Sequence, residues 1–359
     1  MADRIRERRR PPAWQLSLLL VGVLIFVGLI LAVGPQVILR QLQALGWLAP
    51  LVLVPYLASN LLDSLGWWWV VRAEGRASGS GVSVIPHPLR LFVIRAAGEA
   101  VNAITPTAYL GGEPVKAWLL KQRGVPLVLG LTSVLVSKTA LMLTQGVFVL
   151  LGLTLGVHRW QPGIPLWAVA GGGAVLGVLV FGLVIGAQRR GLFGSLLDLS
   201  RRLSGREALL AAWEPDLRAL DDRLRDFYGA RHRDFLVCCT FHFASWMVNA
   251  LDLYVILWLL GSPVDLVTAL ILEALSGVAK LASVIVPGSL GVQEGSQVLI
   301  FAALGLSVPL AVTFGLLRRG RELLWVGFGL GVLLETHALA WLRAGAGREL
   351  SPERRVKTR

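Results

Sequence analysis

The chain has 359 residues, of which 55% are hydrophobic, and its mean hydropathy is +0.67. A soluble domain of this size has too little interior to hide so much apolar surface, so the composition excludes a soluble globular protein and indicates a membrane protein. The net charge of +13 would suit a nucleic-acid partner, but the basic residues stand at the ends of apolar runs, which excludes that partner and indicates membrane topology.

The N-terminal segment, residues 1–13, contains five arginines and precedes an apolar run over residues 14–33. Signal peptides share this plan, but a run of this length exceeds the apolar core of a signal peptide. We therefore predict an uncleaved first span with residues 1–13 in the cytoplasm. Further runs of about the 20 residues needed to cross a bilayer cover residues 46–71, 126–155, 165–187 and 235–260.

Basic residues between the runs set the predicted orientation. The stretch 188–233 contains ten arginines and six basic residues follow Trp341, so both segments should be cytoplasmic, in a cell inner (plasma) membrane. Apolar residues from Trp213 to Phe227 recur at spacings of three and four, which predicts a helix against the membrane surface or the bundle. The predicted parts are a first membrane half (14–187), a cytoplasmic amphipathic linker (188–233), a second membrane half (234–342) and a basic cytoplasmic tail (343–359).

Two stretches resemble each other: NAITPTAYLGGEPVKAWLLKQRG (102–124) and SVIVPGSLGVQEGSQVLIFAALG (283–305). In each, a glutamate follows a proline by seven residues with a glycine between them, and another glycine follows the glutamate by eleven. A further proline opens a long apolar helix, with a basic residue twelve positions beyond it. The matched pairs are Pro106 and Pro287, Gly111 and Gly291, Glu113 and Glu294, Gly124 and Gly305, Pro126 and Pro309, and Lys138 and Arg321. Agreement at so many positions favours an internal duplication.

Each copy runs from an apolar helix through a Pro/Gly-rich break into a helix that is short for a span, which is the pattern of a re-entrant hairpin. The unpaired backbone groups at such a break require protein or a polar cavity around them. Basic loops flank the first hairpin (about 90–124), whereas no Lys or Arg lies at 261–272 or 306–308 beside the second (about 265–305). The predicted fold is an all-α polytopic integral membrane protein with about six full spans and two re-entrant hairpins related as an inverted repeat.

Four basic residues fall inside the predicted membrane helices: Lys138, Arg318, Arg319 and Arg321. A cation at the bilayer centre costs roughly 2.5 to 3.5 kcal/mol on insertion scales, so each needs an anionic partner or a water-filled cavity. The expected internal partners are Glu99, Glu113, Glu294 and Glu322, and the expected external partner is a lipid phosphate. In an alternative arrangement, residues 298–317 form an ordinary span and residues 318–322 a loop, which leaves three arginines outside the membrane.

The candidate substrate-binding residues are those at the two hairpin tips and the charged residues inside the membrane. They are Glu99, Asn102, Thr105, Pro106, Gly111, Gly112, Glu113, Lys116, Lys138, Lys280, Ser283, Pro287, Gly288, Gly291, Gln293, Glu294, Arg318, Arg319, Arg321 and Glu322. Lys280 occupies the repeat position of Glu99, which suggests a pair of opposite charges near the axis. Other polar residues inside apolar runs are candidates for a proton relay, namely Asp63, His242, Asn249, Asp252 and Glu273.

Patterns typical of catalytic and metal sites are absent from the sequence. The five histidines are scattered, and neither an HExxH motif nor a Ser/His/Asp arrangement can be read from the chain. A nucleotide-binding GxxxxGK[ST] loop is also absent. We therefore predict no catalytic residue, no metal and no cofactor, and expect an ion gradient or the lipid gradient itself to drive any transport.

The stretches EAVNAITPTAYLGGEPVKAWLL and VPGSLGVQEG, with the apolar helices after them, resemble a flippase-like integral membrane family first described as the transmembrane region of lysylphosphatidylglycerol synthases. The resemblance covers about residues 14–341. The family's first motif is matched by Asn102, Pro106 and Glu113. It normally contains an Arg, which is absent from the Ala108–Tyr109 region here, and Gly112 is an added glycine. The double glycine and the GVQEG tip are most similar to the subgroup associated with hopanoid biosynthesis.

The resemblance implies movement of a lipid, or of a lipid-linked intermediate, between leaflets. Members with synthase activity have a soluble aminoacyl-transferase domain after the membrane part, whereas this chain ends about 18 residues after its last span, so aminoacylation is not expected. The first candidate function is a translocator for a lipid with an anionic headgroup. The second is a membrane enzyme that uses Glu113 and Glu294 as acid and base. The third is a scaffold for lipid-biosynthesis enzymes, which would tolerate loss of both glutamates.

Overall fold

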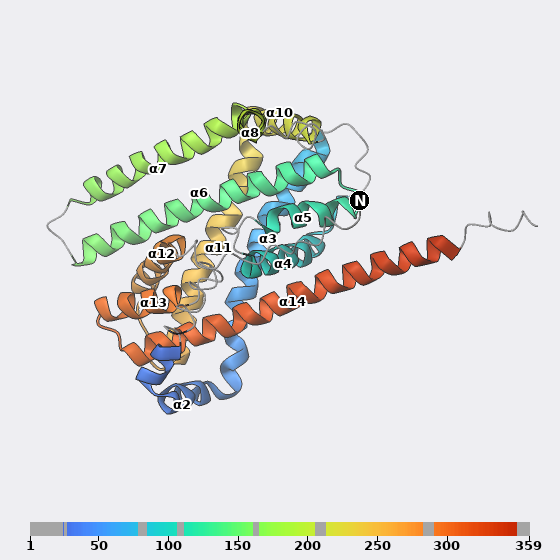
Figure 1. Ribbon diagram of the computed structural model, residues 1–359. Helices are drawn as coiled ribbons and strands as arrows, with labels where there is room; N and C mark the ends of the chain where they lie inside the picture. The colour runs from blue at the N-terminus through green and yellow to red at the C-terminus, as the bar shows by residue number, and fades with distance from the viewer. Residues whose placement is uncertain are drawn as a thin grey trace, which may run out of the picture.

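The computed structural model describes residues 24, 27–77, 85–105, 111–160, 165–204, 213–282 and 291–349, which are nearly all helical and include no strand (Figure 1). The first half contains α2 (Pro35–Leu45), the 3-10 helix η2 (Gly46–Val52), α3 (Leu53–Ala77), α4 (Pro88–Ile104), α5 (Gly112–Lys121), α6 (Leu127–Trp160) and α7 (Leu166–Arg189). The second half contains α8 (Leu192–Ser204), α10 (Glu214–Ala230), α11 (His232–Leu259), α12 (Leu266–Ala282), α13 (Val292–Ala303) and α14 (Val308–Glu349).

Four helical segments of the described residues are long and apolar enough to cross a membrane. They are Gly46–Ala77, Leu127–Arg159, Ala170–Arg189 and His232–Leu259. These segments coincide with the four apolar runs predicted after the first, and they confirm an all-helical integral membrane protein. Most of the first predicted span lies outside the described residues, and its end, residues 27–33, is helical.

The last predicted span is part of α14, which continues without a break through residues 318–322. The alternative that made these residues a loop is therefore wrong. The segment RRGRE contains no proline, and its single glycine costs a helix only about 1 kcal/mol. Its three arginines stay in the bundle because each one meets a carboxylate on another helix, as described below.

Two pairs of helices occupy the positions of the predicted hairpins: α4 packs against α5, and α12 against α13. The same turn follows each pair. Its closing hydrogen bonds run from Val125 N to Leu120 O (3.2 Å) and from Leu306 N to Phe301 O (2.9 Å). Gly124 (φ 86°) and Gly305 (φ 76°) supply the left-handed conformation that this turn requires. Because the turns have the same offset along the chain as the two tip glutamates, the similarity of the two segments extends to their backbone.

Helices α3 and α11 pack against each other at the centre of the bundle, and the two helix pairs lie on either side of them (Figure 1). The long helix after each pair crosses to the opposite half, so that α6 packs against α12 and α14 packs against α4. The two halves thus exchange their long helices.

The linker between the halves folds onto one end of the bundle as α8 and α10 (Figure 1). The apolar face of α10 is buried against α3, α6 and α11, through Leu220, Leu224 and Phe227. Between them, the Asp221 carboxylate accepts hydrogen bonds from the backbone N–H groups of Phe193 (3.1 Å) and Gly194 (2.7 Å) in the first turn of α8. The amphipathic pattern therefore serves contact with the bundle.

Both crossings between the halves depend on a glycine with no room for a side chain. A Cβ atom at Gly329 of α14 would lie 2.2 Å from the Ala96 carbonyl oxygen of α4. At Gly152 of α6, it would lie 2.2 Å from the Cβ atom of Ala274 on α12. Gly331, two residues further along α14, has nothing within 4 Å of this position.

We expect Gly329→Ala to destabilise the protein by about 1 to 3 kcal/mol, because α14 must move away from α4 to admit the methyl group. Gly331→Ala is the matched control and should be neutral or slightly stabilising, since alanine favours a helix. Thermal denaturation in detergent measures both. Equal midpoints for the two variants would contradict the close crossing of α4 and α14.

Candidate functional site

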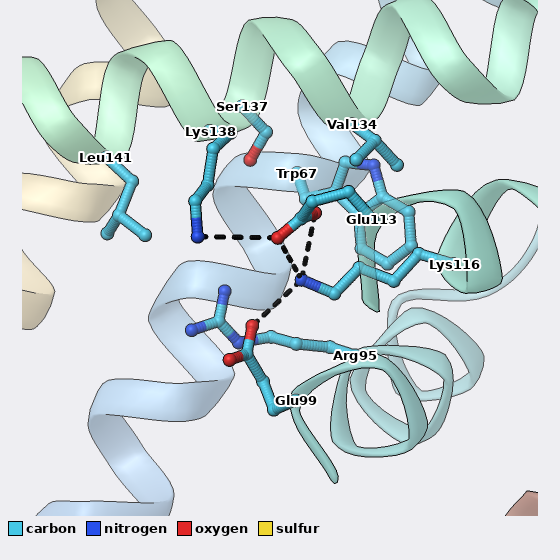
Figure 2. Close-up of a pocket in the computed structure, with 9 residues that line it drawn as sticks. All are labelled: Trp67, Arg95, Glu99, Glu113, Lys116, Val134, Ser137, Lys138 and Leu141. Carbon is cyan, nitrogen blue, oxygen red and sulfur yellow. Dashed lines mark hydrogen bonds and ion pairs between the residues drawn. The ribbon is translucent and has the colours of Figure 1, made fainter. Parts of the chain in front are cut away.

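A small cavity between α3, α4, α5 and α6 brings together most of the charged residues predicted in the first half (Figure 2). Its lining consists of Trp67, Arg95, Glu99, Glu113, Lys116, Val134, Ser137, Lys138 and Leu141. Helical periodicity accounts for this convergence, because lining residues on the same helix are separated by three or four positions and so share one face. Figure 2 shows their charged ends pointing toward one another.

Glu113 is the centre of the cavity's ion pairs. Its carboxylate lies 3.1 Å from the Lys116 ammonium group on the same helix and 3.3 Å from the Lys138 ammonium group on α6. Lys116 also contacts Glu99 of α4 at 2.8 Å. Glu113 and Lys116 are only 6% and 5% exposed, so these charges are held by each other and not by solvent.

Asn102, near the end of α4, connects this helix to the start of α5. Its amide oxygen accepts a hydrogen bond from the Gly112 N–H group (2.7 Å), and its amide nitrogen donates to Glu113 (3.5 Å). A Cβ atom at Gly112 would lie 1.9 Å from the Gly98 carbonyl oxygen, so the added glycine lets α5 start directly against α4. Thr105 ends α4 by donating its hydroxyl to the Val101 carbonyl oxygen (2.6 Å).

Arg95, which the sequence analysis missed, connects the cavity to α3. Its guanidinium group lies 2.7 Å from Asp63, whose other carboxylate oxygen lies 2.7 Å from Nδ1 of His242 on α11. Nε2 of His242 is 3.0 Å from the Ser137 hydroxyl, which lines the cavity. The structure thus brings a Ser, a His and an Asp into one line of contacts that could not be read from the sequence. Arg95 stands four residues before Glu99, and that spacing is a signal that could have revealed it.

The second half has a matching cluster around Glu294. One carboxylate oxygen accepts a hydrogen bond from the N–H group of Gly291, which caps α13 (2.7 Å), and the other pairs with Arg319 of α14 (2.6 Å). Arg319 also contacts Glu322 (3.1 Å). Arg319, and not Arg321, is thus the counterpart of Lys138, and the sequence pairing of Lys138 with Arg321 was wrong by two residues. If the two segments are aligned on Glu113 and Glu294 without a gap, Lys138 matches Arg319, and both basic residues lie on the helix face that meets the glutamate.

The two remaining arginines of α14 take partners from other helices. Arg318 pairs with Glu273 of α12 (2.8 Å), and Arg321 pairs with Asp252 of α11. The Arg321 guanidinium group also lies 4.6 Å from the centroid of the Tyr56 ring. Of the expected internal carboxylates, Glu113, Glu294 and Glu322 pair with an intramembrane cation of the predicted set, and Glu99 pairs with Lys116 instead.

Several buried polar atoms around the second cluster have no hydrogen-bond partner within the described part of the chain. They are Asp252 Oδ2, Glu273 Oε2, both amide atoms of Gln297, and Nε and Nη1 of Arg318. Gln297 holds the position in α13 that Lys116 holds in α5. Because unpaired buried polar atoms are costly, water or a polar ligand group is expected among them.

Of the other predicted site residues, Lys280 interacts electrostatically with Glu322 of the second cluster, and several lie outside the described residues. Lys280 is exposed on α12, whereas Gln293 is buried on α13. Gly111 stands at the start of α5 as its N-cap residue. Pro106, Ser283, Pro287 and Gly288 lie outside the described residues.

Comparison with known proteins gives two matches. The family described as "Lysylphosphatidylglycerol synthase TM region" matches residues 16–331. The chain is also similar to a "UPF0104 membrane protein" of Methanothermobacter thermautotrophicus, with 24% identity over 321 residues that cover 84% of this chain and 89% of the relative. No solved structure matches significantly. Since the family match extends over most of the length, the chain belongs to the family of the lysylphosphatidylglycerol synthase transmembrane region, and it is an integral membrane protein.

Proposed function

We propose that the protein moves a lipid with an anionic headgroup between the two leaflets, through a polar slot formed by the tips of the two helix pairs. The family's name, which refers to synthases of a phospholipid, supports a membrane lipid as the partner. The candidate lipids are an anionic phospholipid and a polyisoprenoid or hopanoid-type lipid. Their apolar tails would stay in the bilayer while the headgroup enters the slot.

The observation that carries the proposal is the buried Glu113 carboxylate between two lysines. A lipid phosphate accepts hydrogen bonds from ammonium groups as a carboxylate does, so it can replace Glu113 as the partner of Lys116 and Lys138. Removing one partner of a buried ion pair costs about 3 to 5 kcal/mol, whereas exchanging one anion for another leaves no charge unpaired. The slot therefore binds a headgroup by exchange.

The arrangement of the halves supports an alternating mechanism. The pair of Glu113 and Lys138 in one half corresponds to the pair of Glu294 and Arg319 in the other. The crossed packing of α6 on α12 and α14 on α4 agrees with an inverted repeat. We infer that the helix pairs are re-entrant hairpins that enter from opposite faces, with both chain ends at the cytoplasmic face of the plasma membrane.

Two other functions lead to different outcomes. A membrane enzyme that used the tip glutamates as acid and base would alter the lipid covalently. A scaffold that held lipid-biosynthesis enzymes through α10 would keep its role without either glutamate. We propose transport without catalysis, because the buried charges are already arranged as exchangeable ion pairs.

The purified protein in liposomes with fluorescent phosphatidylglycerol should expose lipid from both leaflets to dithionite, so that quenching exceeds the protein-free level of about half. The double variant Glu113→Gln with Glu294→Gln should return quenching to that level, because the exchange at both tips is lost. Asp198→Asn is the control, since Asp198 is an exposed residue of α8 beside Arg218. Full activity in the double variant would contradict the proposed slot.

Two single variants should separate binding from movement. Glu113→Gln removes the competing anion, so short-chain phosphatidylglycerol should bind more tightly but cross more slowly. Lys116→Gln removes a cation and should weaken binding about tenfold, equivalent to about 1.4 kcal/mol.

The readouts are affinity by titration in detergent and rate by dithionite quenching. Arg225→Gln, at an exposed position of α10, is the control for a change in total charge. Parallel loss of affinity in both cavity variants would contradict exchange at Glu113.

A further inference from the structure

His242 is the one fully buried histidine among those whose side chains the structure describes. It is 0% exposed, whereas His87, His158 and His232 are exposed. It lies on the central helix α11 and contacts Asp63 of α3 and Ser137 of α6 through its two ring nitrogens. His242 therefore lies in the core of the bundle and also contacts a residue that lines the cavity around Glu113.

The neighbours of His242 fix where a proton can bind. Asp63 also holds Arg95, so its carboxylate is an acceptor and Nδ1 of His242 must carry the hydrogen of their contact. Nε2 then accepts a hydrogen bond from the Ser137 hydroxyl. Nε2 is therefore the basic atom, and it is directed toward a hydroxyl that lines the cavity.

The charged and titratable groups on α11 and on the helices packed against it include one buried thiol and several ion-paired side chains. On α11 the Cys238 thiol is buried one turn earlier, and on α4 Arg95 is engaged by Asp63. On α6 Lys138 is engaged by Glu113. On α12, the buried carboxylate Glu273 is engaged by Arg318. Histidine is the side-chain type that most often takes up and releases protons in proteins, so His242 is the candidate proton site of this network.

A proton on His242 changes the charge of the site. The charged residues of the cavity and its link to α3 are three cations (Arg95, Lys116 and Lys138) and three anions (Asp63, Glu99 and Glu113). With neutral His242 they sum to zero, and with protonated His242 they leave a net positive charge. Asp63 would then neutralise two cations instead of one, which leaves Arg95 more available to an anion in the cavity.

The same three residues have the contacts of a serine nucleophile, its base and its acid, but their surroundings do not suit that chemistry. Ser137 lies within the 34-residue helix α6, where backbone N–H groups are engaged in the helix and cannot stabilise an oxyanion. Protonation of His242 requires no such donors.

We propose that His242 is the proton-binding site of the translocator, so that a proton and an anionic headgroup are taken up together. This inference rests on the proposed function and adds its coupling ion. Linkage makes the effect reciprocal: the proton strengthens headgroup binding, and the headgroup raises the proton affinity of His242. A proton gradient across the membrane would then drive the lipid in the direction of proton flow.

The test is calorimetric titration of the detergent-purified full chain with dihexanoylphosphatidylglycerol in buffers of different ionisation enthalpy, near pH 7. The wild type should take up as much as about one proton per lipid bound, and its affinity should fall by up to about tenfold per pH unit on the alkaline side. His242→Gln should bind lipid without proton uptake. His232→Gln is the matched control on the same helix and should behave as the wild type.

A second measurement needs no change at His242. In the nitrogen-15 spectrum of histidine-labelled wild-type protein, one histidine should gain a proton when the lipid is added at constant pH. Lipid binding and movement without proton uptake, or equal uptake in His242→Gln, would overturn the proton site and leave the translocator intact. Absence of both binding and movement in the wild type would overturn the proposed function, and the proton site with it.

Discussion

The sharing of Glu113 by Lys116 and Lys138 is the interaction on which the first half of the protein depends. A lone charge in this environment is costly, so the carboxylate needs both the lysine of its own helix and the lysine that α6 brings to it. The local structure is arranged to allow this. Gly112 lets α5 begin against the backbone of α4, and the left-handed turn at Gly124 directs α6 back over the pair, so that Lys138 reaches Glu113. The ion pairs and the backbone turns therefore specify the same packing.

The central contact between α3 and α11 joins the two charged clusters. Toward the first cluster, α3 supplies Asp63 and α11 supplies His242; toward the second, Tyr56 of α3 contacts Arg321, which Asp252 of α11 holds. These two helices therefore contribute side chains to both clusters. At the crossings of α4 with α14 and of α6 with α12, glycines bring the helices into close contact, and an ion pair beside them, Arg159 with Asp265 at 3.1 Å, is exposed. Buried polar contacts thus hold the centre of the bundle together, and close helix packing holds the two crossings.

Much of the architecture could be predicted from the sequence, because hydropathy and Gly/Pro punctuation are local signals. The four described apolar spans and the glycines of the turns after each helix pair follow from such signals. The sequence also indicates a set of carboxylate partners for the intramembrane cations, and the structure selects Glu113 for Lys138. The match of Lys138 to Arg321 was wrong because it was counted from the prolines, which stand at different distances from the tip glutamates. Counted from the glutamates, the matching residue is Arg319. His242 contacts Ser137 on one side and Asp63 on the other, and the sequence has no local signal for these contacts. The three residues belong to three helices that meet only through tertiary packing.

The halves differ in charge at matched positions: Gln297 stands where the first half has Lys116, and Lys280 stands where it has Glu99. The amide of Gln297 is buried without a partner in the described part of the chain. In a carrier built from two identical halves, the inward-open and outward-open states are related by a two-fold rotation and have equal free energy. Loss of one symmetry-related cation makes these states unequal, because each exposes a site of different charge. Such a carrier has a preferred resting orientation even in the absence of any gradient. The duplication would then provide the two states, and the difference in charge at Gln297 would determine which of them is more populated before the lipid binds.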